Sequence, residues 1–84
     1  MTKDETSSLD KSQDRPLYAQ LADRIRTEID LREWPVGSRI PSENEIVSRF
    51  QVSRGTVRKA IKQLVSEGLL IQKHGSGTYV ADAD

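Results

Sequence analysis

Large apolar residues recur at about every fourth position in the early part of the chain. They are Leu17, Leu21, Ile25 and Ile29, and Tyr18 and Ala22 widen the same stripe. This spacing places them on one face of an amphipathic helix that begins at Pro16, a residue suited to a first helical turn because no N–H is needed there. The helix is expected to end before Trp34 and Pro35, because a residue that precedes proline is disfavoured in the α conformation.

Two shorter helical patterns follow. Residues 42–45, Ser-Glu-Asn-Glu, have the sequence of a capping box, which marks the start of a helix. Ser53 is the expected N-cap of the next helix, and Gly68 is its expected left-handed C-terminal cap. The apolar faces consist of Ile46, Val47 and Phe50 in the first helix and of Val57, Ala60, Ile61, Leu64 and Val65 in the second. Two helices separated by about three residues predict a helix-turn-helix.

Towards the C-terminus the period of the apolar residues changes to two. Residues 69–72 and 78–81 are each expected to form a short strand, with the glycine-containing segment 73–77 as the turn between them. In the turn-rich connector before the second helix, Arg39 and Ile40 form at most a short edge strand. The order of elements predicts a mainly α domain with a small β-hairpin wing, which is a winged helix-turn-helix.

Composition limits the chain to one small domain. It has 84 residues, 35% of them hydrophobic and 31% charged, and it has no cysteine, which excludes disulfides and cysteine-based zinc sites. Residues 1–15 have too little apolar surface to fold, so we expect a disordered tail there, a folded domain over 16–81 and the start of a linker over 82–84. No apolar run approaches the roughly 20 residues of a membrane span, and no signal peptide is visible.

The charges balance in sum but are segregated along the chain. The sequence has 13 basic and 13 acidic residues, so its formal net charge is zero. Residues 53–80 nevertheless contain five basic residues and one acidic residue, a local charge of +4 that the remainder offsets. Such a segment is either a solvated helix face or a surface for a polyanion such as DNA.

The outward-facing side chains of the helix expected at 53–67 are the first candidates for DNA contact. Arg54 and Arg58 carry the forked donors that match the O6 and N7 atoms of guanine in the major groove. Arg54 also lies in the first turn, where recognition helices make base contacts. Lys59 lies away from the apolar stripe as well. Outside this motif, each arginine is explained equally well as an ordinary surface residue.

Three small residues near the start of this helix are further candidates, and two of them also have structural interpretations. Ser53 is a good N-cap in any protein, but a helix N-terminus also binds phosphate. Glycine costs about 1 kcal/mol relative to alanine within a helix. The presence of Gly55 is explained either by close approach of a nucleic-acid strand to the backbone or by the lower cost of glycine at a helix start. Thr56 offers a hydroxyl group to phosphate and a methyl group to thymine.

Further candidates lie before the first helix of the pair and in the hairpin turn. Before and at the start of that helix they are Arg39, Ser42 and Asn44, and in the hairpin turn they are Lys73, His74, Gly75 and Gly77. The first group is placed for contacts with the DNA backbone, although a capping role explains Ser42 as well. The second group forms a narrow basic tip that suits the negative potential of a minor groove, while a turn with positive φ explains either glycine alone.

No constellation for catalysis or metal binding is present in the sequence. A single histidine without cysteine forms no metal cluster, and the segment 75–77, Gly-Ser-Gly, lacks the full spacing of a nucleophile elbow. A phosphate-binding loop of the G-x-x-x-x-G-K-[ST] type is also absent. The sequence therefore predicts a binding protein that carries no cofactor, and not an enzyme.

These motifs occur in the order found in a known family. Over residues 40–80, IPSENEIVSRFQVSRGTVRKAIKQLVSEGLLIQKHGSGTYV, the chain resembles the DNA-binding domain of GntR-type bacterial transcription regulators. Residues 16–29, PLYAQLADRIRTEI, look like the first helix of the HutC-like branch. The resemblance implies a cytoplasmic, nucleoid-associated protein that binds double-stranded palindromic operators as a dimer, usually as a repressor. It places family contacts with DNA on Ser53, Arg54, Gly55, Thr56, Arg58, His74 and Gly75.

Two departures from the family and one missing part follow from the same resemblance. Many members have arginine where this chain has Asn44, and the lost arginine puts one phosphate or base contact in question. Members also commonly have a residue other than glycine where this chain has Gly55, so the base contact sometimes made there is absent or made by the backbone. Members also continue into a C-terminal domain that binds a small-molecule effector and mediates dimerisation. Because the chain stops at Asp84, we expect a fragment of a longer regulator, with a natural single-domain protein as the alternative.

Two other functions fit part of the pattern. A winged helix whose basic face binds an acidic protein partner would show no preference among duplex sequences. Generic binding of RNA or DNA by the wing would give affinity without sequence preference, and the few aromatic residues argue against stacking on single strands.

Overall fold

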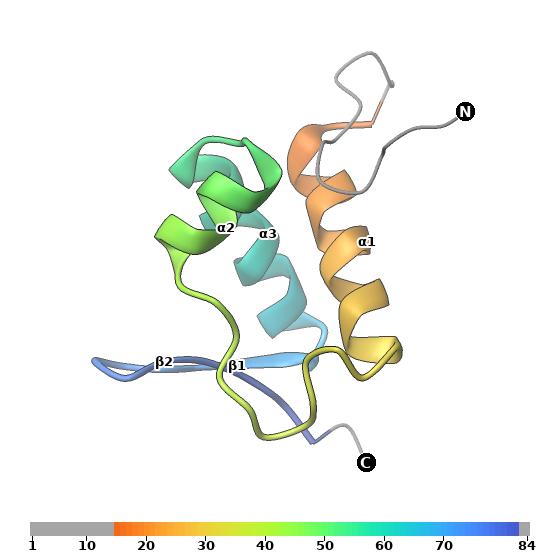
Figure 1. Cartoon of the computed structure of the whole chain (residues 1–84), viewed down its shortest axis with the longest axis vertical. Coiled ribbons are helices and arrows are strands. Elements are labelled where there is room, and N and C mark those ends of the chain that lie inside the picture. Colours follow the sequence, from red (N-terminus) through yellow and green to blue (C-terminus); the bar gives the residue numbers. More distant parts are fainter. Residues whose placement is uncertain (1–14, 83–84) are drawn as a thin grey trace.

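The computed structural model describes residues 15–82, which form three helices followed by a β-hairpin (Figure 1). In chain order the elements are α1 (Leu17–Asp30), α2 (Glu43–Phe50), α3 (Arg54–Ser66), β1 (Leu70–Lys73) and β2 (Gly77–Val80). The two strands pair as an antiparallel sheet. This architecture confirms the predicted winged helix-turn-helix, in which α2 and α3 are the helix pair and the hairpin is the wing.

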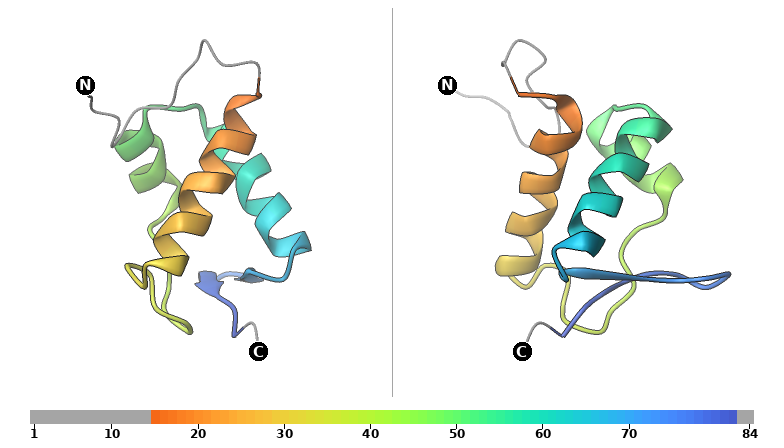
Figure 2. Two further views of the ribbon diagram at one scale, coloured as in Figure 1. Left: turned by 90° about the vertical axis from the view of Figure 1, so that its right-hand side faces the viewer. Right: turned by 180° about the vertical axis from the view of Figure 1, so that it is seen from behind.

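The helices enclose one apolar core, and the wing lies at one end of the helix bundle (Figure 2). The largest fully buried side chains are Phe50, Leu21, Ile25, Ile46, Leu64, Leu70 and Val57. Burial of a side chain of this kind contributes about 1.5–3 kcal/mol. Because Leu70 of β1 and Val80 of β2 belong to the same core, the base of the wing is fixed to the helices. The free part of the wing extends beyond the bundle on the side of α2, away from α1 (Figures 1 and 2).

α1 ends at Asp30, and a Schellman motif forms the stop. Arg32 adopts a left-handed conformation with φ of 64°. Its N–H donates to the Ile29 carbonyl (N···O 3.0 Å), and the Glu33 N–H donates to the Glu28 carbonyl (3.0 Å). This position is usually occupied by glycine. Because it is Arg32 here, the nearest signal in the sequence for the end of α1 is Pro35.

The predicted caps of α2 and α3 are both present. The Glu45 N–H donates to Ser42 Oγ (3.2 Å), and the Ser42 N–H donates to the Glu45 carboxylate (2.9 Å), which completes the capping box. Ser53 caps α3, because its Oγ accepts from the Thr56 N–H (3.1 Å). Gln51, with φ of 58°, turns the chain between the two helices.

The wing begins directly after the C-terminal cap of α3. Gly68 has φ of 83°, as the sequence predicted, and the Leu69 N–H completes the cap by donating to the Leu64 carbonyl (3.0 Å). β1 therefore begins one residue later than predicted, since Leu69 belongs to the cap. β2 begins one residue earlier than predicted, because Gly77 pairs with Lys73.

The connector before α2 forms the short edge that the sequence allowed. Arg39 makes an isolated antiparallel bridge with Tyr79. The Ile40 N–H donates to the Thr78 carbonyl (2.9 Å). β2 thus has β1 on one side and the connector on the other, which secures the base of the wing.

The predicted disordered tail and the predicted linker fall mostly outside the described residues, which begin at Arg15 and end at Asp82. Arg15 is ion-paired with Asp23 of α1 (2.6 Å), and Pro16 is the N-cap of α1. None of the helices in the described part of the chain is long and apolar enough to cross a membrane.

Candidate nucleic-acid interface

α3 presents two faces of opposite character. Its buried side chains, Val57, Ala60, Ile61 and Leu64, contribute to the core. Arg54 and Arg58 lie on the polar side, with side chains 52% and 65% exposed. All five basic residues of the segment 53–80 are exposed, so its excess of positive charge lies on the surface.

A carboxylate from α2 holds both of these arginines. Arg58 donates through Nε to one oxygen of Glu43 (2.9 Å), and Arg54 donates through Nη1 to the other (3.4 Å). The hydrogen bond from Arg58 is the main cause that lowers the pKa of Glu43 below its ordinary value of 4.5, and the same bond raises the pKa of Arg58. Glu43 is therefore ionised at neutral pH and offsets part of the positive charge of the pair.

Glu43 is the residue at this interface that the sequence did not single out. It precedes Arg54 by 11 residues and Arg58 by 15, spacings that match no periodicity within one element. The contact exists only because α2 packs against α3. The only local indication is the position of Glu43 in the first turn of α2, where an acidic residue is already favoured by the helix dipole.

The start of α3 is held together by a small hydroxyl network. Ser53 Oγ accepts from the Thr56 N–H and also donates to Thr56 Oγ1 (3.0 Å). Gly55 lies in open space, since a Cβ atom built on it would meet only Ser53 Oγ, at 3.9 Å. No packing within the described part of the chain therefore requires glycine here, and both explanations of Gly55 stay open.

Lys59 is directed towards α1. Its Nζ lies 4.5 Å from the centre of the Tyr18 ring, a cation–π contact between α3 and α1. Arg26 of α1 also donates to the Glu67 carboxylate at the end of α3 (2.8 Å). These two contacts connect α1 to the middle and to the C-terminal end of α3.

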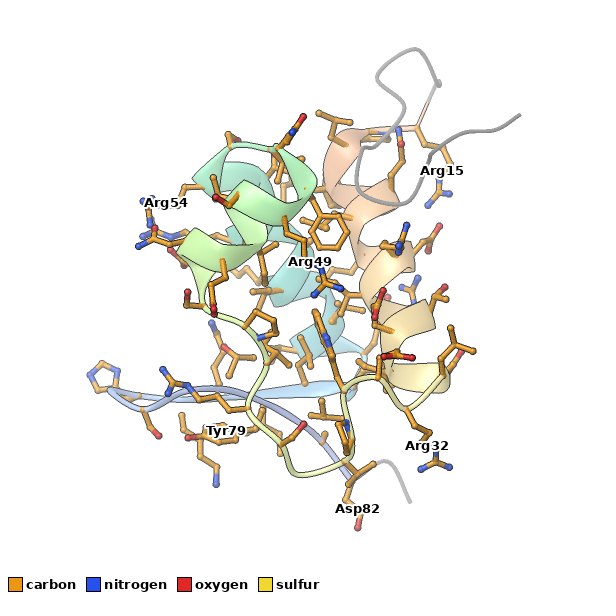
Figure 3. All side chains as sticks on the ribbon, viewed as in Figure 1. Arg15, Arg32, Arg49, Arg54, Tyr79 and Asp82 are labelled. Atoms are coloured by element: carbon orange, nitrogen blue, oxygen red, sulfur yellow. The ribbon has the colours of Figure 1, made fainter. Side chains whose placement is uncertain are left out.

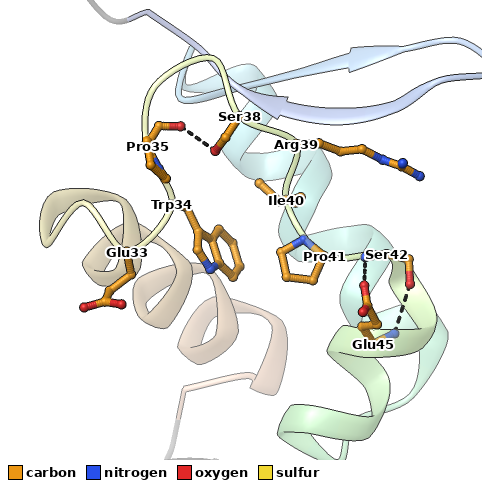
Figure 4. Close-up of a pocket in the computed structure, with 9 residues that line it drawn as sticks. All are labelled: Glu33, Trp34, Pro35, Ser38, Arg39, Ile40, Pro41, Ser42 and Glu45. Atoms are coloured by element: carbon orange, nitrogen blue, oxygen red, sulfur yellow. Dashed lines mark hydrogen bonds between the residues drawn. The ribbon is translucent and has the colours of Figure 1, made fainter.

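The Arg39 side chain runs along the wing to Gly77, at the end of β2 that adjoins the turn. A Cβ atom on Gly77 would lie 2.7 Å from Arg39 Nε, and Gly77 has φ of 135°. The backbone conformation favours glycine here, and a Cβ atom would also displace the exposed Arg39 side chain. Figure 4 shows the Arg39 side chain directed away from Trp34.

The hollow drawn in Figure 4 is separate from the basic face of α3. It has a volume of about 470 Å³ and lies between the connector and the first turn of α2. Ser42 and Glu45, which form the capping box, line one wall, and Trp34 lines another. Asn44 is exposed in the same first turn of α2.

The tip of the wing, residues 73–77, contains four of the predicted contacts and is exposed over residues 73–76. Gly75 has φ of 77°, which confirms that the turn needs positive φ at this position. Lys73 Nζ lies 5.1 Å from the centre of the Tyr79 ring, and the Tyr79 hydroxyl is hydrogen-bonded to the Ser76 hydroxyl (2.7 Å). His74 is exposed at the tip.

The structure places the start of α3 and the wing on the same side of the molecule. Figure 3 shows Arg54 on the side to which the hairpin of Figure 1 extends. A helix with forked cationic donors beside a projecting basic tip can contact two adjacent grooves of a duplex. Within residues 15–82, no group of three His, Cys, Asp or Glu side chains could hold a metal ion.

Known proteins share this sequence and this fold. The family described as "Bacterial regulatory proteins, gntR family" matches residues 17–80. The histidine utilization repressor of Pseudomonas aeruginosa is 43% identical over 67 residues, which cover 80% of this chain and 27% of that protein. The mannosyl-D-glycerate transport/metabolism system repressor MngR of Escherichia coli is 47% identical over 68 residues, 81% of this chain and 28% of MngR.

The solved structure described as "AraR(DBD) in complex with operator ORX1" is similar as well, with a TM-score of 0.83 and 41% identity over 88% of this chain and 94% of that chain. The chain thus matches 94% of a solved DNA-binding domain but spans only 27% of the length of the histidine utilization repressor of Pseudomonas aeruginosa. By sequence and fold the chain belongs to the GntR family of bacterial regulatory proteins, a family of regulators and not of enzymes, and within it to the HutC-like branch.

Proposed function

We propose that this chain is the operator-binding domain of a bacterial transcription repressor, with α3 in the major groove and the tip of the wing, residues 73–77, in the minor groove. The observation that carries the proposal is the exposed pair Arg54 and Arg58 at the start of α3, on the side to which the wing extends. The similarity to AraR(DBD), whose structure is described as a complex with operator DNA, supports this mode of binding.

Each part of the interface has a separate task in this proposal. Arg54 and Arg58 bind base edges, because a guanidinium group matches the two acceptors of guanine. Ser53, Gly55 and Thr56 bind a phosphate at the N-terminus of α3, where N–H groups and the helix dipole favour an anion. The remaining contacts come from Arg39, Ser42, Asn44, Lys59, Lys73, His74, Gly75 and Gly77.

The family supplies a proposal for the rest of the regulator. A C-terminal domain would bind a small-molecule effector and pair two copies, so that two α3 helices enter successive major grooves about 34 Å apart on an inverted repeat. Linking two domains raises the effective concentration of the second, so a single domain binds more weakly than the pair. The regulator would act in the bacterial cytoplasm, at the nucleoid.

Variants of the two arginines test the proposal on a duplex recovered by selection from a random-sequence pool. Arg54→Ala and Arg58→Ala are each expected to cost roughly 1–3 kcal/mol in binding and to relax the base preference. Arg32→Ala is the matched control, because it also removes one positive charge but lies at the end of α1, far from Arg54 (Figure 3). Fluorescence anisotropy at fixed salt measures the dissociation constants of the three variants and of the native chain for the selected duplex.

The results separate the proposal from its rivals. Unchanged binding of the selected duplex by both arginine variants would exclude α3 as the recognition helix. Equal affinity of the native chain for selected and scrambled duplexes would favour generic nucleic-acid binding. Absence of binding to any duplex would favour an acidic protein partner.

A further inference from the structure

Three charged side chains from two helices meet on the exposed side of the helix pair. Arg54 and Arg58 come from α3, and Glu43 comes from the first turn of α2. Each carboxylate oxygen accepts from a different arginine, at 3.4 Å and 2.9 Å. Glu43 is the most buried member of the group, with 34% of its side chain exposed, so it is positioned by the protein more firmly than the arginines are.

We propose that Glu43 is a specificity-determining residue that orients Arg54 and Arg58 for base recognition and weakens their attachment to non-cognate DNA. This inference rests on the proposed function, because it assigns a task within the same interface. Glu43 acts through the two arginines and is therefore a positioning residue.

The geometry explains how one carboxylate can orient a guanidinium group for guanine. Arg58 uses Nε to reach Glu43, and no other described residue accepts from its Nη1 or Nη2. These two terminal nitrogens form the fork that matches O6 and N7 of guanine. A bond at Nε therefore fixes the plane of the fork and leaves the fork itself unoccupied. Arg54, held at Nη1, keeps Nη2 and Nε for the same purpose.

The charge of the group explains the effect on non-cognate DNA. Two arginines and one carboxylate sum to +1, so the cluster presents half the positive charge that the arginines alone would present. Non-specific binding depends on neutralised phosphates, and each additional neutralised phosphate changes the salt dependence by about 0.9 in log K against log salt. The carboxylate remains charged at neutral pH, since the hydrogen bond from Arg58 lowers the pKa of Glu43.

Two substitutions separate orientation from charge. Glu43→Gln keeps the length of the side chain and removes its charge, while Glu43→Asp keeps the charge and shortens the side chain so that it no longer reaches both arginines. Glu33→Gln is the matched control for charge, because Glu33 is exposed on the connector beyond the end of α1. For each protein, anisotropy gives the dissociation constants for the selected duplex and for a scrambled duplex at four salt concentrations.

The expected results differ between the variants. Glu43→Gln should bind the scrambled duplex more tightly, lower the ratio of scrambled to selected dissociation constants by about tenfold, and steepen the salt dependence by about 0.9. Glu43→Asp should lower the ratio with an unchanged salt dependence. Glu33→Gln should match the native chain in both. In the Arg58→Ala background, the loss of discrimination caused by Glu43→Gln should shrink, because one of its two targets is absent.

Several results would overturn the inference. If both Glu43 variants keep the native ratio, the three charges are an ordinary surface ion pair, which typically contributes little. An undiminished effect of Glu43→Gln in the Arg58→Ala background would mean that Glu43 does not act through Arg58, which contradicts its proposed task of orienting both arginines. A native chain without preference for the selected duplex would overturn both this inference and the proposed function, whereas a clear native preference with unaffected variants would overturn the inference alone. Circular dichroism of each variant establishes that it is folded.

Discussion

Replacing Gly55 with alanine distinguishes the two explanations of glycine at the start of α3. The residue does not have a positive φ, and an added Cβ atom would meet only Ser53 Oγ, at 3.9 Å. Alanine is favoured over glycine by up to about 1 kcal/mol in a helix, and less near a helix end. We therefore expect a gain of about 0.5–1 kcal/mol in the free energy of unfolding, which raises the Tm of a domain of this size by roughly 2–8 °C.

DNA binding is expected to change in the opposite direction. If the backbone of Gly55 donates to a phosphate at close range, a methyl group holds the strand away. Loss of a hydrogen bond to a charged group costs about 1.5–3 kcal/mol, which is roughly a 10- to 100-fold increase in Kd. Thermal unfolding followed by circular dichroism and anisotropy with the selected duplex measure both effects on one protein preparation.

The control for Gly55→Ala is the same substitution at the other end of α3. Gly68 has φ of 83°, so alanine is expected to lower the Tm there, while the Kd for DNA stays unchanged. A Gly55→Ala variant with the native Kd would refute close approach of DNA to this residue. A Tm that does not rise would refute the argument from open space around it.

Three further predictions concern the core, the wing and the acid limit of stability. Leu64→Ala is expected to cost about 2–5 kcal/mol in urea unfolding, because the side chain is fully buried, and a loss below 1 kcal/mol would contradict the assigned core. Gly77→Ala should lower the Tm and weaken DNA binding together, because φ is 135° and the added Cβ displaces Arg39; an unchanged Tm would contradict the strain described there. The hydrogen bond from Arg26 lowers the pKa of Glu67 below 4.5 in the folded state, so the unfolded chain takes up its proton first as the pH falls. The stability from this pair is therefore present above about pH 4.5 and lost below it, and Glu67→Gln should lower the Tm at pH 7 but scarcely at pH 3; equal losses at both pH values would contradict this assignment.

The elements that could be predicted from the sequence are those with local determinants. Ser42 and Glu45 satisfy each other across one helical turn, so their spacing alone predicts the start of α2. Gly68 ends α3 because it adopts a left-handed conformation at little cost, and this preference is independent of the rest of the fold. The apolar stripe of α3 then determines which side faces the core, and hence that Arg54 and Arg58 are exposed.

The details that could not be predicted depend on contacts between distant parts of the chain. Arg32 adopts a conformation that usually belongs to glycine, so the end of α1 has no local mark. Lys59 lies over Tyr18 only because α1 packs along α3. Glu43 has an evident local function at the start of α2, and its second function, as acceptor for two arginines, requires the packed helix pair.

The balance of charges has a similar explanation. A net charge of zero argues against a nucleic-acid partner only if the charges are mixed evenly, and here the basic residues of the segment 53–80 are all exposed. The acidic remainder lowers non-specific attraction to DNA while the recognition helix and the wing keep their cations. Glu43 applies the same principle at the scale of a single contact.

Selection of bound duplexes from a random-sequence pool, at a stated salt concentration, tests the central claim most directly. Recognition of bases by α3 predicts an enriched motif with guanines that depend on Arg54 and Arg58, arranged as inverted half-sites about one helical turn apart when two copies bind. A bound pool whose sequences show no enriched motif would contradict the claim that this chain recognises an operator.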